Sequence, residues 1–217
     1  MTAVSLAFLT EQLELADQLL AARKTMLRPQ DLPGRYGRVV KAVDHLLKAI
    51  NAEAVLGGGW AVWRHGFVGR ITQDMDIVLA ADQVEEFLRV ASISGFEIIP
   101  ESAGRWPKVR HKDTDVKVDI LPEGGRPGTP SKMAPTTIPH PSRLGASGPS
   151  LVYAELPALV ELKLAAGRLG DEHDVLELIR ANPNQLDAVR QHLAGVQGDY
   201  VQGFDRLVQR AREQVDH

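Results

Sequence analysis

The stretch 55–79 constrains what this chain can fold into more than any other part of the sequence. A short apolar run breaks into three consecutive glycines, helix-compatible residues follow, and a second apolar run begins with Asp74 and Asp76. Apolar runs of this length, interrupted by glycine, are typical of buried strands joined by tight turns. The stretch therefore predicts a strand, a turn, a short helix and a second buried strand.

The two aspartates that open the second strand predict a cation site. Residues two apart in a strand point to the same side, so the side chains of Asp74 and Asp76 should project together. Two adjacent carboxylates repel each other and are costly to desolvate unless a cation lies between them. Hard oxygen ligands of this kind suit Mg²⁺ or Mn²⁺.

This arrangement resembles the nucleotidyltransferase superfamily that shares the palm of DNA polymerase beta. An apolar residue, a glycine pair, a short helix and Asp-x-Asp at the start of a strand form its signature, here Leu56, Gly58, Gly59, Asp74 and Asp76. The residues between them are similar to those of the minimal members, the antibiotic nucleotidyltransferases and nucleotidyltransferase toxins: Trp60, Ala61, Val62, Arg70 and Thr72.

The resemblance implies an α/β (α+β) fold with a small mixed sheet of the palm type. Helical spacing of apolar residues over 4–24 and 39–50 predicts N-terminal helices that flank this sheet. From Tyr153 onward the chain is predicted to be helical, in a C-terminal bundle. We therefore expect a nucleotidyltransferase core with N-terminal helices over 1–150 and a C-terminal helical region over 151–217.

A third carboxylate is expected on the strand 115–121, whose side chains alternate between apolar and polar. The family places this carboxylate on a strand beside the Asp-x-Asp strand. Asp119 is the preferred candidate because it lies within the apolar strand rather than at its edge. Asp115, nearer the start of the strand, is the alternative, and a solvated Asp119 paired with Lys117 is also open.

Carried over residue by residue, the resemblance assigns a two-metal mechanism to these positions. Asp74 and Asp76 would bridge two Mg²⁺ ions, with Mn²⁺ as the substitute, and Asp119 would bind the metal that carries the acceptor hydroxyl and act as general base. The backbone at Gly58 and Gly59 would approach the phosphates at the start of the short helix.

A charged cluster in the C-terminal half suggests further contacts with the nucleotide. Lys163, Arg168 and Asp174 are similar in spacing to a pattern in nucleotidyltransferase toxins, although His173 stands where a basic residue usually precedes the aspartate. Lys163 would meet the triphosphate, and Arg70 is a second cation that could reach a phosphate. The other reading of Lys163 is a solvated helix face with pairs at helical spacing.

Residues 122–150 are rich in proline and glycine and show no apolar period, which predicts a long loop. Loops of this length are usually functional or mobile. Lys132, His140 and Arg143 could meet substrate there, and the alternative is a mobile loop with no catalytic role.

Composition limits the class of protein. The chain of 217 residues has no cysteine, which favours a reducing, cytoplasmic location. It has no run of about 18 apolar residues that would cross a membrane, and Glu11 and Glu14 argue against a signal peptide. A net charge of −3 argues against a strongly basic nucleic-acid-binding surface.

Two functions follow from the sequence. The first is a Mg²⁺-dependent nucleotidyltransferase that moves a nucleoside monophosphate from an NTP to an acceptor hydroxyl, on a small molecule such as an antibiotic or at an RNA 3′ end. The second is a catalytically silent binding module of the same fold in a toxin–antitoxin or regulatory complex. Convergence of Asp74, Asp76 and Asp119 would favour the enzyme. The sequence leaves the acceptor, the nucleotide and the oligomeric state open.

Overall fold

A mixed six-stranded sheet forms the centre of the computed structural model, which describes residues 5–21, 27–68, 70–100, 106–129 and 132–213. The strand order is β3-β4-β5-β2-β1-β8. The strands are β1 (Ala54–Leu56), β2 (Met75–Leu79), β3 (Phe96–Ile99), β4 (Lys108–His111), β5 (Lys117–Pro122) and β8 (Leu151–Tyr153). Strand β2 lies between β1, to which it is antiparallel, and β5, to which it is parallel.

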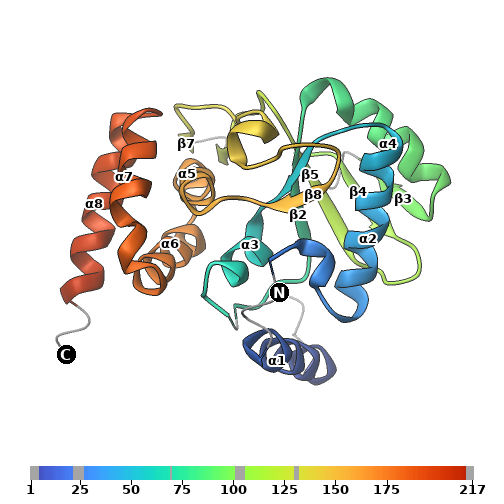
Figure 1. Cartoon of the computed structure of the whole chain (residues 1–217), viewed down its shortest axis with the longest axis horizontal. Coiled ribbons are helices and arrows are strands. Elements are labelled where there is room, and N and C mark those ends of the chain that lie inside the picture. Colours follow the sequence, from blue (N-terminus) through green and yellow to red (C-terminus); the bar gives the residue numbers. More distant parts are fainter. Residues whose placement is uncertain (1–4, 22–26, 69, 101–105, 130–131, 214–217) are drawn as a thin grey trace.

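Helices cover this sheet and extend from one end of it (Figure 1). The four C-terminal helices lie together, on the side of the molecule away from α2 and α4 (Figure 1). The helices are α1 (Leu6–Ala21), α2 (Gly34–Ala49), α3 (Gly58–Arg64), α4 (Val84–Ile93), α5 (Leu156–Ala166), α6 (Leu169–Ala181), α7 (Leu186–Ala194) and α8 (Gly198–Glu213). Short 3₁₀ helices are η1 (Pro29–Asp31), η2 (Ala81–Gln83), η4 (Pro141–Leu144) and η5 (Pro183–Gln185). The fold class expected from the sequence is confirmed.

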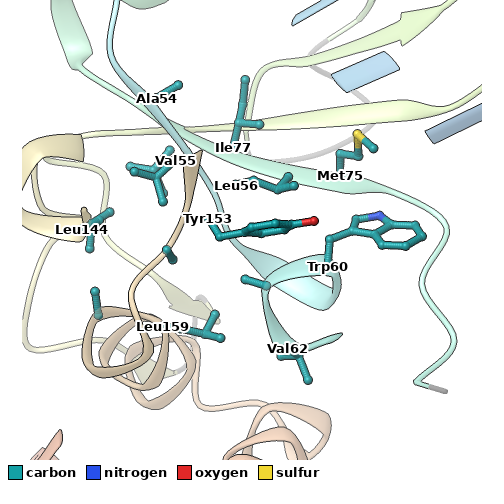
Figure 2. Close-up of a cluster of buried hydrophobic side chains, with 14 of the residues drawn as sticks. Ala54, Val55, Leu56, Trp60, Val62, Met75, Ile77, Leu144, Tyr153 and Leu159 are labelled. Atoms are coloured by element: carbon teal, nitrogen blue, oxygen red, sulfur yellow. The ribbon is translucent and has the colours of Figure 1, made fainter. Parts of the chain in front are cut away.

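The predicted order of strand, glycine turn, short helix and strand is present at the middle of the sheet. Helix α3 begins directly after β1, and its tryptophans, Trp60 and Trp63, are fully buried. The ring centroids of Tyr36 and Trp60 lie 4.5 Å apart, which ties α2 to α3. Figure 2 shows Trp60 beside Tyr153 and Met75, below the strands β1 and β2. This apolar packing fixes α3, and with it the glycine turn, against the sheet.

Strand β8 was not predicted. The sequence predicts that the chain is helical from Tyr153 onward, whereas residues Leu151–Tyr153 form a strand that pairs with β1 in parallel and completes the sheet. A three-residue strand after a serine- and glycine-rich run is too short to show periodicity. The division of the chain at residue 150 stays a prediction, and β8 follows that point directly.

The predicted loop 122–150 contains more structure than expected. Strands β6 (Gly128–Thr129) and β7 (Lys132–Met133) form a two-stranded ladder, and the 3₁₀ helix η4 follows. Ile138 and Leu144 are buried in the main core, so apolar side chains anchor the segment at both of these points. Among the described helices, none combines the length and the apolar character needed to cross a bilayer.

Candidate active site

Three side chains form a row across the middle of the sheet. Lys108 of β4 is the cross-strand partner of Asp119 in β5, and Asp119 is the partner of Asp76 in β2. Cross-strand partners present their side chains on the same face of a sheet. Asp76 and Asp119 are therefore neighbours on one face, as the alternation of strand 115–121 led us to expect. We call these three residues the carboxylate row.

Lys108, at one end of this row, forms an ion pair with Asp119, the middle member. Its Nζ lies 2.6 Å from Oδ2 of Asp119, and the side chains are only 22% and 17% exposed, respectively. The other carboxylate oxygen of Asp119, Oδ1, is buried and forms no hydrogen bond within the described part of the chain. A buried acceptor without a partner is costly, and a proton or a cation would satisfy it.

Asp76 lies against the glycine turn. A Cβ atom placed on Gly58 would come within 1.8 Å of Oδ2 of Asp76, and Gly58 has a positive φ of 55°. Only glycine fits this position without moving the carboxylate or straining the backbone. Burial, followed by the charge of the neighbouring Asp119, raises the pKa of Asp76. The site is thus arranged so that a second negative charge is unfavourable until a cation compensates it.

Asp74 is placed differently from the other two carboxylates. It precedes β2, which begins at Met75, and it is exposed. Partial desolvation and the charge of Asp119 raise the pKa of Asp74. Across the described residues, no three His, Asp or Glu side chains are gathered closely enough to hold a metal ion. The three expected ligands are therefore not preassembled, because Asp74 is outside the strand and Asp119 is turned to Lys108.

Asp115, the alternative third carboxylate, lies away from this row. It has a positive φ of 58°, its side chain is 82% exposed, and one oxygen lies 3.5 Å from Nε of Arg110. The register between β2 and β5 places Asp119, and not Asp115, beside Asp76.

The predicted nucleotide contacts at Gly59 and Arg70 lie together. A Cβ on Gly59 would come within 2.5 Å of Oγ1 of Thr72 and 2.6 Å of Nη1 of Arg70. Arg70 also donates from Nε to Oδ1 of Asp174, at 2.7 Å. The arginine therefore lies over the glycine turn while holding a carboxylate of α6, and it links the core to the C-terminal helices.

Lys163 is buried, which corrects the reading of a solvated helix face. Its Nζ lies 3.0 Å from Asp171 and 2.7 Å from Asp174, and all three side chains are at most 6% exposed. Arg168 in turn holds Asp171, with Nε 2.7 Å from Oδ2. Although burial opposes it, the hydrogen bond from Arg168 and the charge of Lys163 lower the pKa of Asp171. These ion pairs, together with the one between Arg70 and Asp174, form a network that we call the buried ion network; its members are Arg70, Lys163, Arg168, Asp171 and Asp174.

A single pocket brings residues of both regions together. Gly58, Asp76, Asp119, Lys163 and Arg168 line it, so the sheet and helices α5 and α6 contribute jointly. The rest of the lining includes Trp106, Leu121, Pro127, Gly128, Ile138, Leu159, Leu162, Ala166 and Asp171. Asp74, Gly59 and Arg70 do not line it.

Sequence reasoning missed Lys108, which contacts Asp119, and assigned no individual role to Asp171, which contacts Lys163. Lys108 falls within 106–111, a stretch that the sequence suggests as a strand, but its partner depends on the register with β5. Asp171 lies three residues after Arg168, at helical spacing, and this was the available signal.

The predicted substrate contacts of the loop 122–150 are dispersed. Lys132 lines a second pocket, between the β6–β7 ladder and α8, that shares Lys163 with the first. His140 accepts a hydrogen bond from the backbone of Ser142 at the start of η4, and Arg143 is exposed.

Comparison with known protein families gives one match, to part of the chain. The family model described as aminoglycoside-2′′-adenylyltransferase matches residues 39–126, the part that contains β1, the glycine turn, β2 and β5. No curated protein matches the chain.

Two solved structures are similar, at 14% identity over 82% of this chain. One is the crystal structure of ANT(2′′)-Ia in complex with adenylyl-2′′-tobramycin, of which 97% is covered with a TM-score of 0.43. The other is the solution structure of the antibiotic-resistance factor ANT(2′′)-Ia, of which 92% is covered with a TM-score of 0.41. The family match over residues 39–126 agrees with the expected resemblance to nucleotidyltransferases and with the expectation of an enzyme of that class.

Proposed function

We propose that this protein transfers a nucleoside monophosphate from an NTP to a hydroxyl group of a small molecule, and that divalent metal ions, Mg²⁺ first, support the reaction. The observation that carries the proposal is the pocket in which Asp76 and Asp119 face the same space as Gly58, Lys163 and Arg168. Carboxylates for metal ions and cations for phosphate are the two requirements of nucleotidyl transfer. The family match makes an aminoglycoside the first acceptor class to test.

The residues present suit a divalent ion. Oδ1 of Asp119 is a buried oxygen without a hydrogen-bond partner among the described residues, and Asp76 is its cross-strand neighbour, whose pKa is raised by burial and by the charge of Asp119. Asp74, at the entrance of β2, would complete the set after a rotation of its exposed side chain. Divalent ions in such a site neutralise the triphosphate and stabilise the attacking and leaving oxygens.

Asp119 is the residue that would accept the proton. The acceptor hydroxyl oxygen forms a bond to the α-phosphorus of the NTP, the bond between that phosphorus and pyrophosphate breaks, and the hydroxyl proton passes to Asp119. Lys108 donates a hydrogen bond to Oδ2 of this carboxylate, and Oδ1 has no hydrogen-bond partner among the described residues.

The nucleotide would be held from two sides. Gly58 brings the backbone close to the carboxylates without a side chain in the way. Arg168 lines the pocket and its side chain is 69% exposed, so its remaining donors are open to a phosphate. Lys163 supports this side through its ion pairs with Asp171 and Asp174, and its charge lowers the pKa of Asp76 against the larger effects that raise it.

The test is a transfer assay with the purified protein. Each α-labelled NTP is incubated with Mg²⁺ and either an aminoglycoside panel that includes tobramycin, or total RNA. We expect a labelled small molecule that depends on Mg²⁺ and disappears in Asp76→Asn. Label only in RNA would redirect the proposal to an RNA 3′ end. No transfer to either, with NTP still bound, would identify a silent binding module instead.

A further inference from the structure

The carboxylate row already contains a cation. Lys108 and Asp119 are direct cross-strand partners, their charged atoms lie 2.6 Å apart, and both side chains are mostly buried. Within the described chain, Lys108 is the cation that forms an ion pair with Asp119. The other cations near the pocket, Lys163 and Arg168, hold carboxylates of α6. Lys108 is therefore placed where a metal ion would have to compete with it.

An ordinary cross-strand ion pair would satisfy both oxygens of the carboxylate or leave the second one in water. Here Lys108 donates to Oδ2, while Oδ1 is buried and has no hydrogen-bond partner in the part of the chain that the structure describes. Asp119 also raises the pKa of both Asp76 and Asp74. The ammonium thus compensates one oxygen of the row and leaves the remaining negative potential for another cation.

We propose that Lys108 is a stand-in cation: it compensates Asp119 when no metal is bound, competes with the divalent ion for this carboxylate, and thereby sets the affinity of the site for metal. The inference rests on the proposed function in that Asp76 and Asp119 are taken as metal ligands. Because the ammonium of Lys108 already neutralises part of the charge of Asp119, a divalent ion would gain less by binding beside this carboxylate than it would without the lysine.

The experiment compares wild-type protein with Lys108→Met, which keeps the length and apolar stem of the side chain but removes its charge. Lys117→Met is the matched control, because Lys117 lies on the same face of β5, two residues from Asp119, and its charge acts on Asp74. Lys108→Arg keeps the charge. Thermal unfolding is measured in EDTA and in saturating Mg²⁺ or Mn²⁺, and Mn²⁺ affinity is measured by electron paramagnetic resonance.

We expect Lys108→Met to unfold at a lower temperature than wild type in EDTA and to recover most of this difference when Mg²⁺ or Mn²⁺ is added. We also expect it to bind Mn²⁺ more tightly than wild type, by about tenfold, which corresponds to about 1.4 kcal/mol. Lys117→Met and Lys108→Arg should stay within about twofold of wild type, the range of a weak exposed interaction.

Two results would overturn the inference. A loss of stability in Lys108→Met that metal does not restore would make the pair a plain structural contact. Unchanged or weaker Mn²⁺ binding in Lys108→Met, with binding intact in wild type, would show that the lysine does not compete. Failure of the proposed function would give a different result from failure of this inference. Wild-type protein would then transfer no nucleotide, regardless of the unfolding temperature and Mn²⁺ affinity of Lys108→Met.

Discussion

The carboxylate row on the sheet and the buried ion network between α5 and α6 contain the same kinds of side chain but are balanced differently. In the network, Lys163 contacts two carboxylates, and Arg70 and Arg168 hold the remaining oxygens of Asp174 and Asp171. In the row, one buried oxygen of Asp119 has no hydrogen-bond partner among the described residues, and the pKa of Asp76 is raised rather than lowered. Balanced charges favour a structural role, whereas an unbalanced site is available to a ligand.

The largest effect on activity is expected from Asp119→Ala. Loss of general-base catalysis alone is typically worth about 10²–10⁴ in rate, and the loss of a metal ligand should add to it. NTP binding should be retained, and relief of the repulsion with Asp76 should offset part of the stability that is lost when Lys108 loses its partner. Single-turnover transfer and thermal unfolding measure the two effects.

Asp115→Ala is the control for that substitution, because Asp115 is exposed and outside the row. Equal and small losses of turnover in the two variants would show that Asp119 is not the base. A collapse of stability in Asp119→Ala alone would mean that the row is structural, like the network.

Lys163→Met should have the largest effect on stability. It leaves Asp171 and Asp174 buried without their shared cation, and breaking a buried pair on one side costs about 3–5 kcal/mol. Lys132→Met, on an exposed strand at the rim of the second pocket, should change the free energy of unfolding by less than about 0.5 kcal/mol. Urea titration measures the free energy of unfolding of both variants. Similar values for Lys163→Met and Lys132→Met would contradict the structural role of the network.

The network should also make stability depend on acid pH. The folded pKa of Asp171 is lowered, so its contribution is fully present above the unfolded pKa of about 3.9 and is lost as the pH falls through the lower, folded value. Urea unfolding of wild type and Asp171→Asn should therefore differ by about 1–3 kcal/mol at neutral pH and converge once the pH lies below the lowered, folded pKa of Asp171. A difference in unfolding free energy that does not change with pH would show that the lowered pKa of Asp171 is not its cause. Asp82→Asn is the control, because Asp82 is exposed.

Asp76→Asn should change stability with the opposite sign, and by less than Lys163→Met. A carboxyl whose folded pKa is raised costs stability once the pH exceeds its unfolded pKa, because the folded state resists its ionisation. Removing the charge should stabilise the metal-free protein at neutral pH by about 1 kcal/mol while abolishing its response to Mg²⁺. Mg²⁺ binding is measured by calorimetry. Identical binding by wild type and by this variant would count against Asp76 as a ligand.

Local sequence patterns were enough to predict the strand–turn–helix–strand unit, because glycine placement and apolar runs act over a few residues. The alternation of 115–121 also predicted correctly that Val116, Val118 and Ile120 are buried and that Asp119 faces the other way. The roles of the site residues stay predictions. What the sequence did not provide was pairing between distant segments: Lys108 with Asp119, Lys163 with Asp171 and Asp174, and β8 with β1. Each depends on register or helix packing, which no local pattern specifies.

Strand β8 also determines when the protein can finish folding during synthesis. Its partner β1 is made almost a hundred residues earlier, as the pairing of Ala54 with Leu151 shows. Until the ribosome has released residues Leu151–Tyr153, the outer edge of β1 has no neighbour and remains open to other chains. A chain truncated before β8 would keep all three aspartates but retain this exposed edge. Such a fragment should aggregate rather than serve as a minimal enzyme.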